Sequence, residues 1–221
     1  MIDQLAANYP STDWNDIPVG LMNFGSGGIN SHGIVCGNVL AAQWVLRLLG
    51  APANVLQHQL RWFENTFLPT NAAAVDYRSG TWTAPSGFAW GELPLGGAAI
   101  PSTLYPIPAN NAPKVKPGNV GCHSAHTKWK VAAQSWLAAK GSNYNRDRCG
   151  KTTYDAVYKL CTLINAWKAG QTIDGSLDPS VTGCKVSGCH GGTNPYPVTG
   201  VSGNMKCEPC HTQRIGDGHN L

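Results

Sequence analysis

The stretch Cys184–His211 reads CKVSGCHGGTNPYPVTGVSGNMKCEPCH. It contains two close cysteine pairs, and a histidine directly follows the second cysteine of each pair. The later pair is Cys207 and Cys210, and the earlier pair, Cys184 and Cys189, has two more residues between its cysteines. Large apolar side chains are scarce from residue 171 onward, so this part of the chain cannot build a hydrophobic core of its own. A bound group must therefore organise it.

The later pair has the attachment pattern of c-type haem. Two cysteines at this spacing can form thioethers with the two vinyl groups of one porphyrin, and the next residue, His211, then binds the iron. The earlier pair ends in the same way at His190, and Gly188 gives the backbone the freedom that its longer loop needs. The sequence therefore predicts two covalent haems c, attached through Cys184, Cys189, Cys207 and Cys210.

Paired cysteines have two other common uses. Four thiolates from two nearby pairs are typical of a zinc ribbon, and an exported chain can join its cysteines as disulfides. The histidines favour haem, because the chain has only seven and two of them directly follow the pairs. Only 16 residues separate His190 from Cys207, so the two haems are expected to lie close together and to exchange electrons rapidly.

The composition limits the partners of the chain. Charged residues make up only 13% of the 221 residues, about half the usual share, so we expect some surface to be covered by a partner or a cofactor. The net charge of +4 is small and scattered, which argues against nucleic acid. No apolar run approaches the roughly 20 residues of a membrane span.

The start of the numbering shows no secretory signal, because no basic region leads into an apolar stretch. Cytochromes of this type acquire haem outside the cytoplasmic membrane. We therefore expect a periplasmic or extracellular protein whose export signal was removed or lies outside this numbering.

Apolar residues at three- and four-residue spacing predict four helices before residue 176. Pro52 is expected at the first position of the second helix, and Ser124 is expected to cap the third. In the fourth helix, Val157 and Trp167 are expected in the buried stripe. The expected helices cover residues 37–49, 52–67, 128–140 and 149–169.

Glycine and proline determine the remaining organisation. The cluster Gly25–Gly28 lacks the Lys-Ser/Thr of a phosphate-binding loop, so a plain turn is expected there. Prolines recur through residues 76–120 and exclude a long helix. We therefore expect a mainly α fold, with a helical domain and irregular loops over residues 1–175. A haem-wrapping segment with little secondary structure is expected over residues 176–221.

Five histidines remain for the second axial position of the two haem irons. His219 lies in the same coreless tail, while His126 and His123 share a turn before a helix, and these three are the candidates. His58 and His32 are expected to be structural. A haem iron with two histidine ligands is closed to substrate, so such haems suit electron transfer rather than chemistry at iron.

Four further cysteines stand alone, and an iron–sulfur cluster generally takes four. On one continuous helix, Cys149 and Cys161 would be roughly 18 Å apart at 1.5 Å per residue, too far to bind one small cluster. Cys161 is therefore expected in apolar packing. The candidate cluster ligands are Cys36, Cys122 and Cys149, with His123 or a partner chain for a fourth position.

Three segments resemble a known family. Residues 24–41, FGSGGINSHGIVCGNVLA, are similar to the glycine-rich, cysteine-containing signature of the C_GCAxxG_C_C family. Cys122-His123 is similar to a second family cysteine, and residues 148–159, RCGKTTYDAVYK, are similar to the third. With two Cys-His haem sites after that helix, residues 24–67 and 118–211 resemble the split-Soret cytochromes c.

This resemblance implies a mainly helical homodimer from an anaerobic, sulfate-reducer-like bacterium. It implies two parallel, nearly touching haems in each subunit, with one axial histidine of each donated by the other subunit. It also implies an iron–sulfur centre, for which the Cys36, Cys122 and Cys149 positions match. The chain departs from the family pattern at Lys130, where relatives have a further cysteine.

Together these features predict an exported dihaem electron carrier rather than an enzyme, with copies of itself and redox proteins as partners. Two alternatives remain open. In the first, one haem keeps an open iron site and reduces a small oxidant. In the second, the chain is a subunit of an electron-conducting polymer that shared haem ligation holds together.

Overall fold

The structure, a computed structural model, describes residues 7, 8, 10, 11, 13–70, 113–134, 144–179 and 181. Within these residues the chain is helical, and the only sheet-like pairing there is an isolated antiparallel bridge between Leu68 and Val115. The predicted mainly α fold is thereby confirmed. The elements are η1 (Asp13–Asp16), η2 (Val19–Gly25), α2 (Gly37–Leu48), α3 (Ala53–Asn65), α4 (Cys122–Ala132) and α6 (Tyr144–Lys168).

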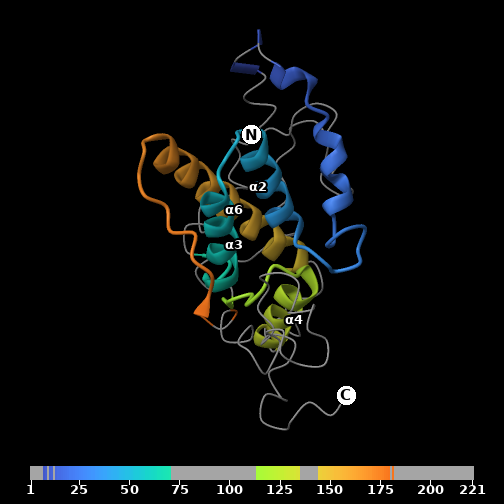
Figure 1. The fold of residues 1–221 in the computed structure, drawn as a ribbon. Coiled ribbons are helices and arrows are strands. Elements are labelled where there is room, and N and C mark those ends of the chain that lie inside the picture. Colours follow the sequence, from blue (N-terminus) through green and yellow to red (C-terminus); the bar gives the residue numbers. More distant parts are fainter. Residues whose placement is uncertain are drawn as a thin grey trace, which may run out of the picture.

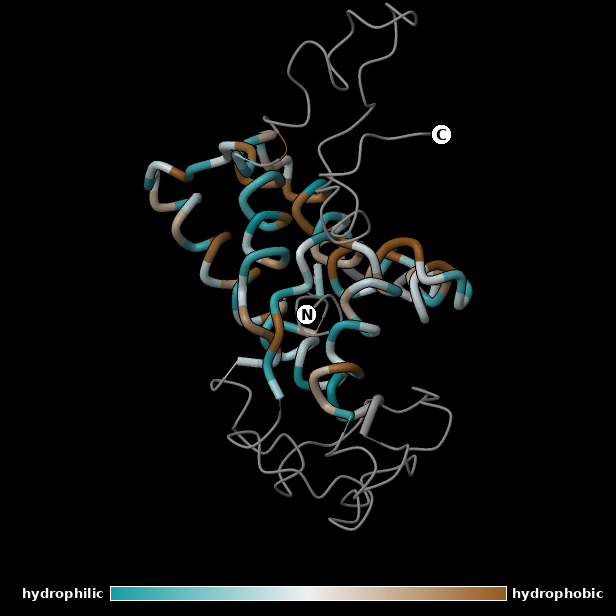
Figure 2. Tube along the Cα trace, turned by 90° about the horizontal axis from the view of Figure 1, so that it is seen from below, coloured by the Kyte–Doolittle hydropathy of each residue, from teal (hydrophilic) through white to brown (hydrophobic). Residues whose placement is uncertain are grey.

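Helices α2, α3 and α6 form the centre of the described structure (Figure 1). Each of the three contacts the other two, and η2 lies against α2. Along the helices hydrophobic and hydrophilic residues alternate, as amphipathic helices require (Figure 2). Burying one large aliphatic side chain contributes about 1.5–3 kcal/mol, so this core carries much of the stability. Its buried residues are Ala42, Val45, Leu46, Ala51, Val55, Leu56, Leu160 and Leu163.

A second core joins α4 to this group of helices. Cys36, Phe63 and Ala125 are buried together there, with Val39 and Leu68. Trp129 lies on α4 four residues after Ala125 and is fully buried. Its Nε1 donates a hydrogen bond to the Pro113 carbonyl at 2.8 Å. The second core therefore lies where the chain segments before α2 and before α4 meet.

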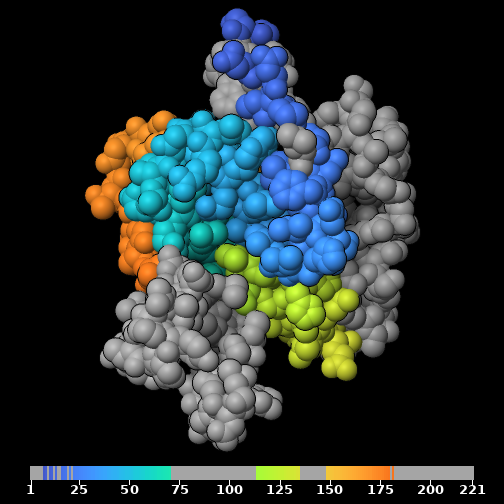
Figure 3. Space-filling view, turned by 45° about the vertical axis from the view of Figure 1, so that its right-hand side comes forward, coloured from blue at the N-terminus to red at the C-terminus, as the bar shows by residue number. Residues whose placement is uncertain are grey.

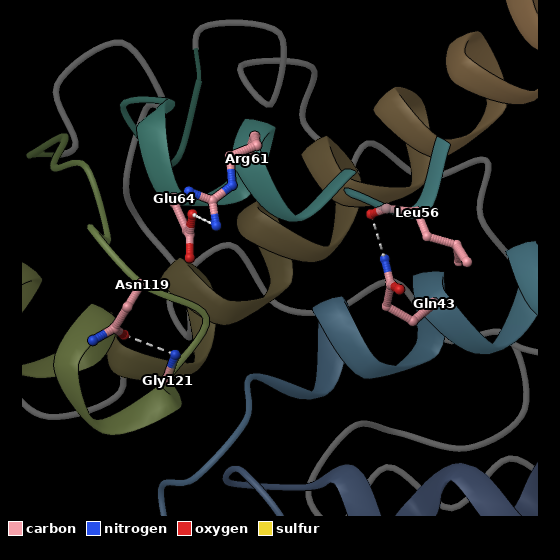
Figure 4. A network of polar contacts seen from close by, with 6 residues as sticks. All are labelled: Gln43, Leu56, Arg61, Glu64, Asn119 and Gly121. Carbon is pink, nitrogen blue, oxygen red and sulfur yellow. Dashed lines mark hydrogen bonds and ion pairs between the residues drawn. The ribbon is translucent and has the colours of Figure 1, made fainter. Parts of the chain in front are cut away.

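Polar side chains fix two junctions of the fold (Figure 4). Gln43 of α2 donates to the Leu56 carbonyl at 3.0 Å and to Gln59 Oε1 at 2.8 Å, which links α2 to α3. Asn119 Oδ1 accepts a hydrogen bond from the Gly121 backbone N–H at 2.8 Å, which fixes the turn before α4. Both contacts satisfy polar groups that folding removes from water.

The predicted helix ends are correct for α2 to within one residue, but each of the other three helices differs at one end or both. Pro52 is the N-cap of α3 rather than its first residue, and α3 ends before Phe67, whose side chain is 56% exposed. Helix α4 begins at Cys122 rather than at residue 128, so Ser124 lies inside the first turn instead of capping it. Helix α6 begins at Tyr144 rather than at residue 149.

The buried stripe of α6 also differs from the prediction. Ala156, Leu160 and Leu163 are buried, whereas Val157 is 43% exposed and Cys161 is also exposed. Each residue turns the helix by about 100°, so Val157 and Cys161 lie to one side of the stripe that faces α2 and α3. The expected apolar packing of Cys161 was wrong.

Residues 171–178 follow α6 and run along α3 (Figure 1). Asn54 Nδ2 donates to the Ile173 carbonyl at 3.0 Å, and His58 Nδ1 donates to the Asp174 carbonyl at 2.8 Å. His58 is thus half-buried and bonds the segment after α6, rather than packing in the core as expected. The two hydrogen bonds also hold the residues just before the predicted haem-wrapping segment against α3.

No helix among the described residues is long and apolar enough to cross a membrane. The predicted haem attachment residues Cys184, Cys189, Cys207 and Cys210 lie outside the described residues, and so do the predicted ligands His190, His211 and His219.

Candidate metal centre

The glycine-rich segment before α2 forms a left-handed turn. Gly27 and Gly28 have φ of 60° and 77°, and the next three residues also have positive φ, although none of them is glycine. Left-handed backbone costs a non-glycine residue about 1–2 kcal/mol. The loop is closed by hydrogen bonds from the Gly33 N–H to the Gly27 carbonyl and from the Ile34 N–H to the Gly28 carbonyl, both at 3.0 Å. Backbone strain of this kind is concentrated at functional sites, so the residues that contact this loop are candidates for a site.

The loop lies against the first turn of α4. A Cβ atom on Gly28 would lie 2.6 Å from the Cβ of Cys122, and one on Gly33 would lie 2.9 Å from the Cβ of His123. Neither distance is possible for real atoms without a shift, so only glycine permits this approach. Figure 3 shows the same contact on the surface, where the N-terminal segment in blue meets α4 in green.

Backbone hydrogen bonds hold two cysteine-bearing segments together. The Cys36 N–H donates to the Val120 carbonyl at 2.8 Å, and the His123 N–H donates to the Gly33 carbonyl at 2.9 Å. Cys36 is the N-cap of α2, and Cys122 is the first residue of α4. Both cysteines thus lie at helix N-termini, where the helix dipole favours a thiolate.

Three of the four lone cysteines influence one another electrostatically. The pKa of Cys36 is raised to about 11, chiefly by burial and to a smaller extent by the charges of Cys122 and Cys149, while the Asn38 backbone N–H and Arg148 oppose the rise. Burial also raises the pKa of Cys122, followed by the charge of Cys149, and Arg148 again opposes the shift. All three thiols are free of disulfides.

The fourth lone cysteine does not join this group. Cys161 lies on α6 together with Cys149, and the helix between them is continuous. At 1.5 Å per residue the two positions are roughly 18 Å apart, as the sequence analysis required.

The donors of this group are thiols, which are the ligands that iron–sulfur clusters use. Within the described residues, no group of three or more His, Cys, Asp or Glu side chains meets the geometry of a site for one metal ion. The fit of this group to an iron centre therefore rests on its donor chemistry, three free thiols from three separate segments.

Sequence reasoning missed Arg148. This residue directly precedes Cys149 on α6, its side chain is only 2% exposed, and it acts electrostatically on both Cys36 and Cys122. Its position beside a candidate ligand was the available signal. Burial of an arginine could not be read from the sequence, because arginine is mostly exposed.

The candidate axial histidines of the helical domain lie on α4. His123 is exposed in the first turn of that helix, and His126 is half-buried one turn further on. His32 is exposed in the left-handed loop.

Comparisons with known proteins give one relative and one similar fold. No family model matches the chain. It is 27% identical over 206 residues to split-Soret cytochrome c of Desulfovibrio desulfuricans. The matched region covers 90% of this chain and 61% of that protein. The chain therefore spans about three fifths of the length of the curated relative that it matches.

The similar fold is that of a solved structure described as "A novel iron centre in the split-Soret cytochrome c", from the same species. The TM-score is 0.65 at 23% identity, and the match covers 97% of this chain and 78% of that one. At this identity the likeness concerns the fold. The chain is therefore a relative of split-Soret cytochrome c, with the same helical fold.

Proposed function

We propose that the chain is a dihaem c-type cytochrome that transfers electrons. The observation that carries this proposal is the two cysteine pairs in residues 184–211, each followed directly by histidine. The relation to split-Soret cytochrome c over 90% of the chain supports it. Cys184 with Cys189 and Cys207 with Cys210 attach the haems, and His190 and His211 are the proximal ligands.

Each haem has a second histidine ligand, and at least one comes from a neighbouring subunit. His219 is the candidate in the tail, and His126 and His123 are the candidates on α4. The exposure of His123 and its place at the start of a helix support a contact with another subunit. The low share of charged residues, 13%, is also expected for a chain that covers surface against a copy of itself.

An iron–sulfur centre is bound at Cys36, Cys122 and Cys149. Their convergence from three segments supports this assignment, as does the iron centre named in the description of the similar structure. When bound, such a centre stores and releases one electron at a time. Because the pKa of Cys36 is raised to about 11, iron must displace protons from the thiols, and binding is expected to weaken as the pH falls.

The protein works outside the cytoplasmic membrane, where c-type haem is attached. The absence of a membrane-crossing helix among the described residues is compatible with this location.

Intact mass tests the main claim. The isolated protein should exceed its polypeptide mass by two haems, roughly 1.2 kDa in all. The double variant Cys207→Ala/Cys210→Ala should lose one haem and keep the other. A mass equal to the bare chain, or to the chain plus zinc, would contradict the proposal. A fully low-spin spectrum of the oxidised protein is expected, since an open iron site for a small oxidant would be high-spin.

Counting non-haem iron tests the second site separately. Cys36→Ser should remove non-haem iron and acid-labile sulfide but leave both haems in place. Cys161→Ser is the matched control, because Cys161 is a free cysteine on the same helix as Cys149 but far from the group. Equal iron loss in both variants would contradict the assignment of the three cysteines.

A further inference from the structure

The side chain of Arg148 is buried without a carboxylate partner among the described residues. It is only 2% exposed, and Nη2 donates to the Ala125 carbonyl at a long 3.4 Å. Its Nε is buried and makes no hydrogen bond in the described part of the chain. The ion pair found among those residues joins Arg61 to Glu64 within α3 and does not involve Arg148.

A buried charge without a counter-charge strongly disfavours the folded state. Arginine cannot relieve this cost by becoming neutral, because a guanidinium keeps its positive charge in proteins. Among the described residues, Arg148 acts electrostatically on the thiols of Cys36 and Cys122. Its hydrogen bond reaches the Ala125 carbonyl on α4, three residues after Cys122, and Arg148 itself directly precedes Cys149 on α6. The guanidinium therefore lies beside the cysteine-bearing segments, where thiolates bound to iron would supply negative charge.

We propose that Arg148 is the counter-charge of the three-cysteine site, where its guanidinium neutralises the negative charge of a thiolate-bound iron centre and tightens its binding. The inference rests on the iron site proposed above and adds a residue to it. Arg148 is a positioning residue, because it acts through the charge of the centre and is not a ligand.

This role has two measurable consequences. Second-sphere partners of a metal site typically change metal affinity by about 10–100-fold, so loss of the guanidinium should weaken iron retention by a similar factor. A cation beside the centre also favours the state with one more electron. The reduction potential of the iron centre should therefore become more negative when Arg148 is made neutral, while the haem potentials change less.

The test uses the full haem-loaded protein in three variants. Arg148→Gln removes the charge, Arg148→Lys keeps it, and Arg47→Gln removes an exposed charge from α2 as the control. Non-haem iron is counted, and its loss to a ferrous chelator is followed in time. Iron is then removed, and urea unfolding of the iron-free proteins is compared.

Arg148→Gln should lose non-haem iron to the chelator about 10–100-fold faster than the wild type, and its haem content should be unchanged. Arg148→Lys should recover part of the loss, and Arg47→Gln should match the wild type. Without iron, Arg148→Gln should be at least as stable as the wild type, because the variant no longer buries an uncompensated charge.

Two results would overturn this inference and leave the iron site standing. One is equal iron retention in Arg148→Gln and the wild type. The other is a large loss of stability in iron-free Arg148→Gln, which would make the role of Arg148 structural. A wild type without non-haem iron, or with iron that survives Cys36→Ser, would instead refute the proposed site and this inference with it.

Discussion

At the scale of single residues, two glycines show what the cysteine site requires. Gly28 and Gly50 both have left-handed backbone, with φ of 77° and 70°. A Cβ on Gly28 would meet Cys122 at 2.6 Å, whereas a Cβ on Gly50 would meet nothing within 4 Å. Comparing alanine variants at these two positions therefore separates the cost of backbone strain from the cost of a steric clash with Cys122.

Replacing Gly28 with Ala should destabilise the protein by about 2 kcal/mol more than replacing Gly50 with Ala. Both variants lose the backbone freedom of glycine, about 1 kcal/mol, but only the first forces Cys122 away. Urea unfolding of the two variants measures the difference. Gly28→Ala should also hold less non-haem iron. Equal stabilities of the two variants would show that the loop can shift away from Cys122 without a loss of stability.

Asp155 gives the structure a pH dependence of its own. Its carboxylate is 3% exposed and accepts hydrogen bonds from the Thr70 backbone N–H at 2.7 Å and from the Thr70 hydroxyl. Burial raises the pKa of this carboxyl, although the two bonds from Thr70 and the charge of Lys114 oppose the shift. A raised pKa in the folded state means that this group favours folding at low pH and loses that contribution as the pH rises.

The wild type should therefore gain stability relative to Asp155→Asn as the pH falls from about 7 to about 3. The variant has no proton to bind at this position, so the difference between the two proteins isolates the carboxyl. Urea unfolding of both proteins at each pH measures it. A difference that stays constant, or one that shrinks toward low pH, would contradict the assigned direction.

Residue spacing predicted part of the arrangement of the lone cysteines and missed the rest for a physical reason. The rise per residue of a helix is fixed, so the separation of Cys161 from Cys149 followed from the sequence alone. The same spacing did not place Cys161 correctly with respect to solvent, because a shift of one position rotates a side chain by about 100°. Burial of Arg148 depends on contacts with other segments, which periodicity does not contain.

At the scale of the helices, ends fixed by local sequence were predictable and ends fixed by distant contacts were not. Helix α2 ends at Leu48, just before Gly50, whose left-handed backbone stops the helix. The start of α4 depends instead on Asn119, whose buried Oδ1 accepts from the Gly121 N–H and the Ser124 hydroxyl. The sequence indicated Ser124 as the cap, because a serine before an apolar stretch usually has that role.

Replacing Asn119 with Ala should therefore cost about 1–2 kcal/mol, because it leaves the Gly121 N–H without its partner and loosens the first turn of α4. Ser124→Ala should cost less, since the bond between Asn119 and Gly121 remains. Urea unfolding gives both values. A larger effect from Ser124→Ala would restore the serine as the principal cap.

At the scale of the whole molecule, the helical domain and the haem segment were predictable to different degrees. The mainly α fold followed from helical spacing of apolar residues around positions such as Val55 and Leu160, which are indeed buried. The two proposed haem sites rest on chemistry that is local in the sequence, since the cysteine pairs and their histidines are adjacent. The distal ligands are not local, because they depend on how subunits meet.

The assembly should therefore be linked to the state of the haems. If His126 or His219 caps a haem of a neighbouring subunit, dissociation removes a strong-field ligand from that iron. His126→Ala and His219→Ala should each produce a high-spin fraction, and a variant that breaks a cross-subunit bond should also reduce the size of the assembly. His123→Ala tests the third candidate, and His32→Ala, from an exposed loop position, is the control.

Sedimentation and the spectrum of the oxidised haems should be followed together during dilution. Because each cross-subunit bond joins oligomer size to spin state, the two signals should change over the same concentration range. Fully low-spin His126, His123 and His219 variants would exclude all three as ligands. A spectrum that stays unchanged when the wild type is diluted to monomer would place both axial ligands within one subunit, and the shared-ligand assembly would be wrong.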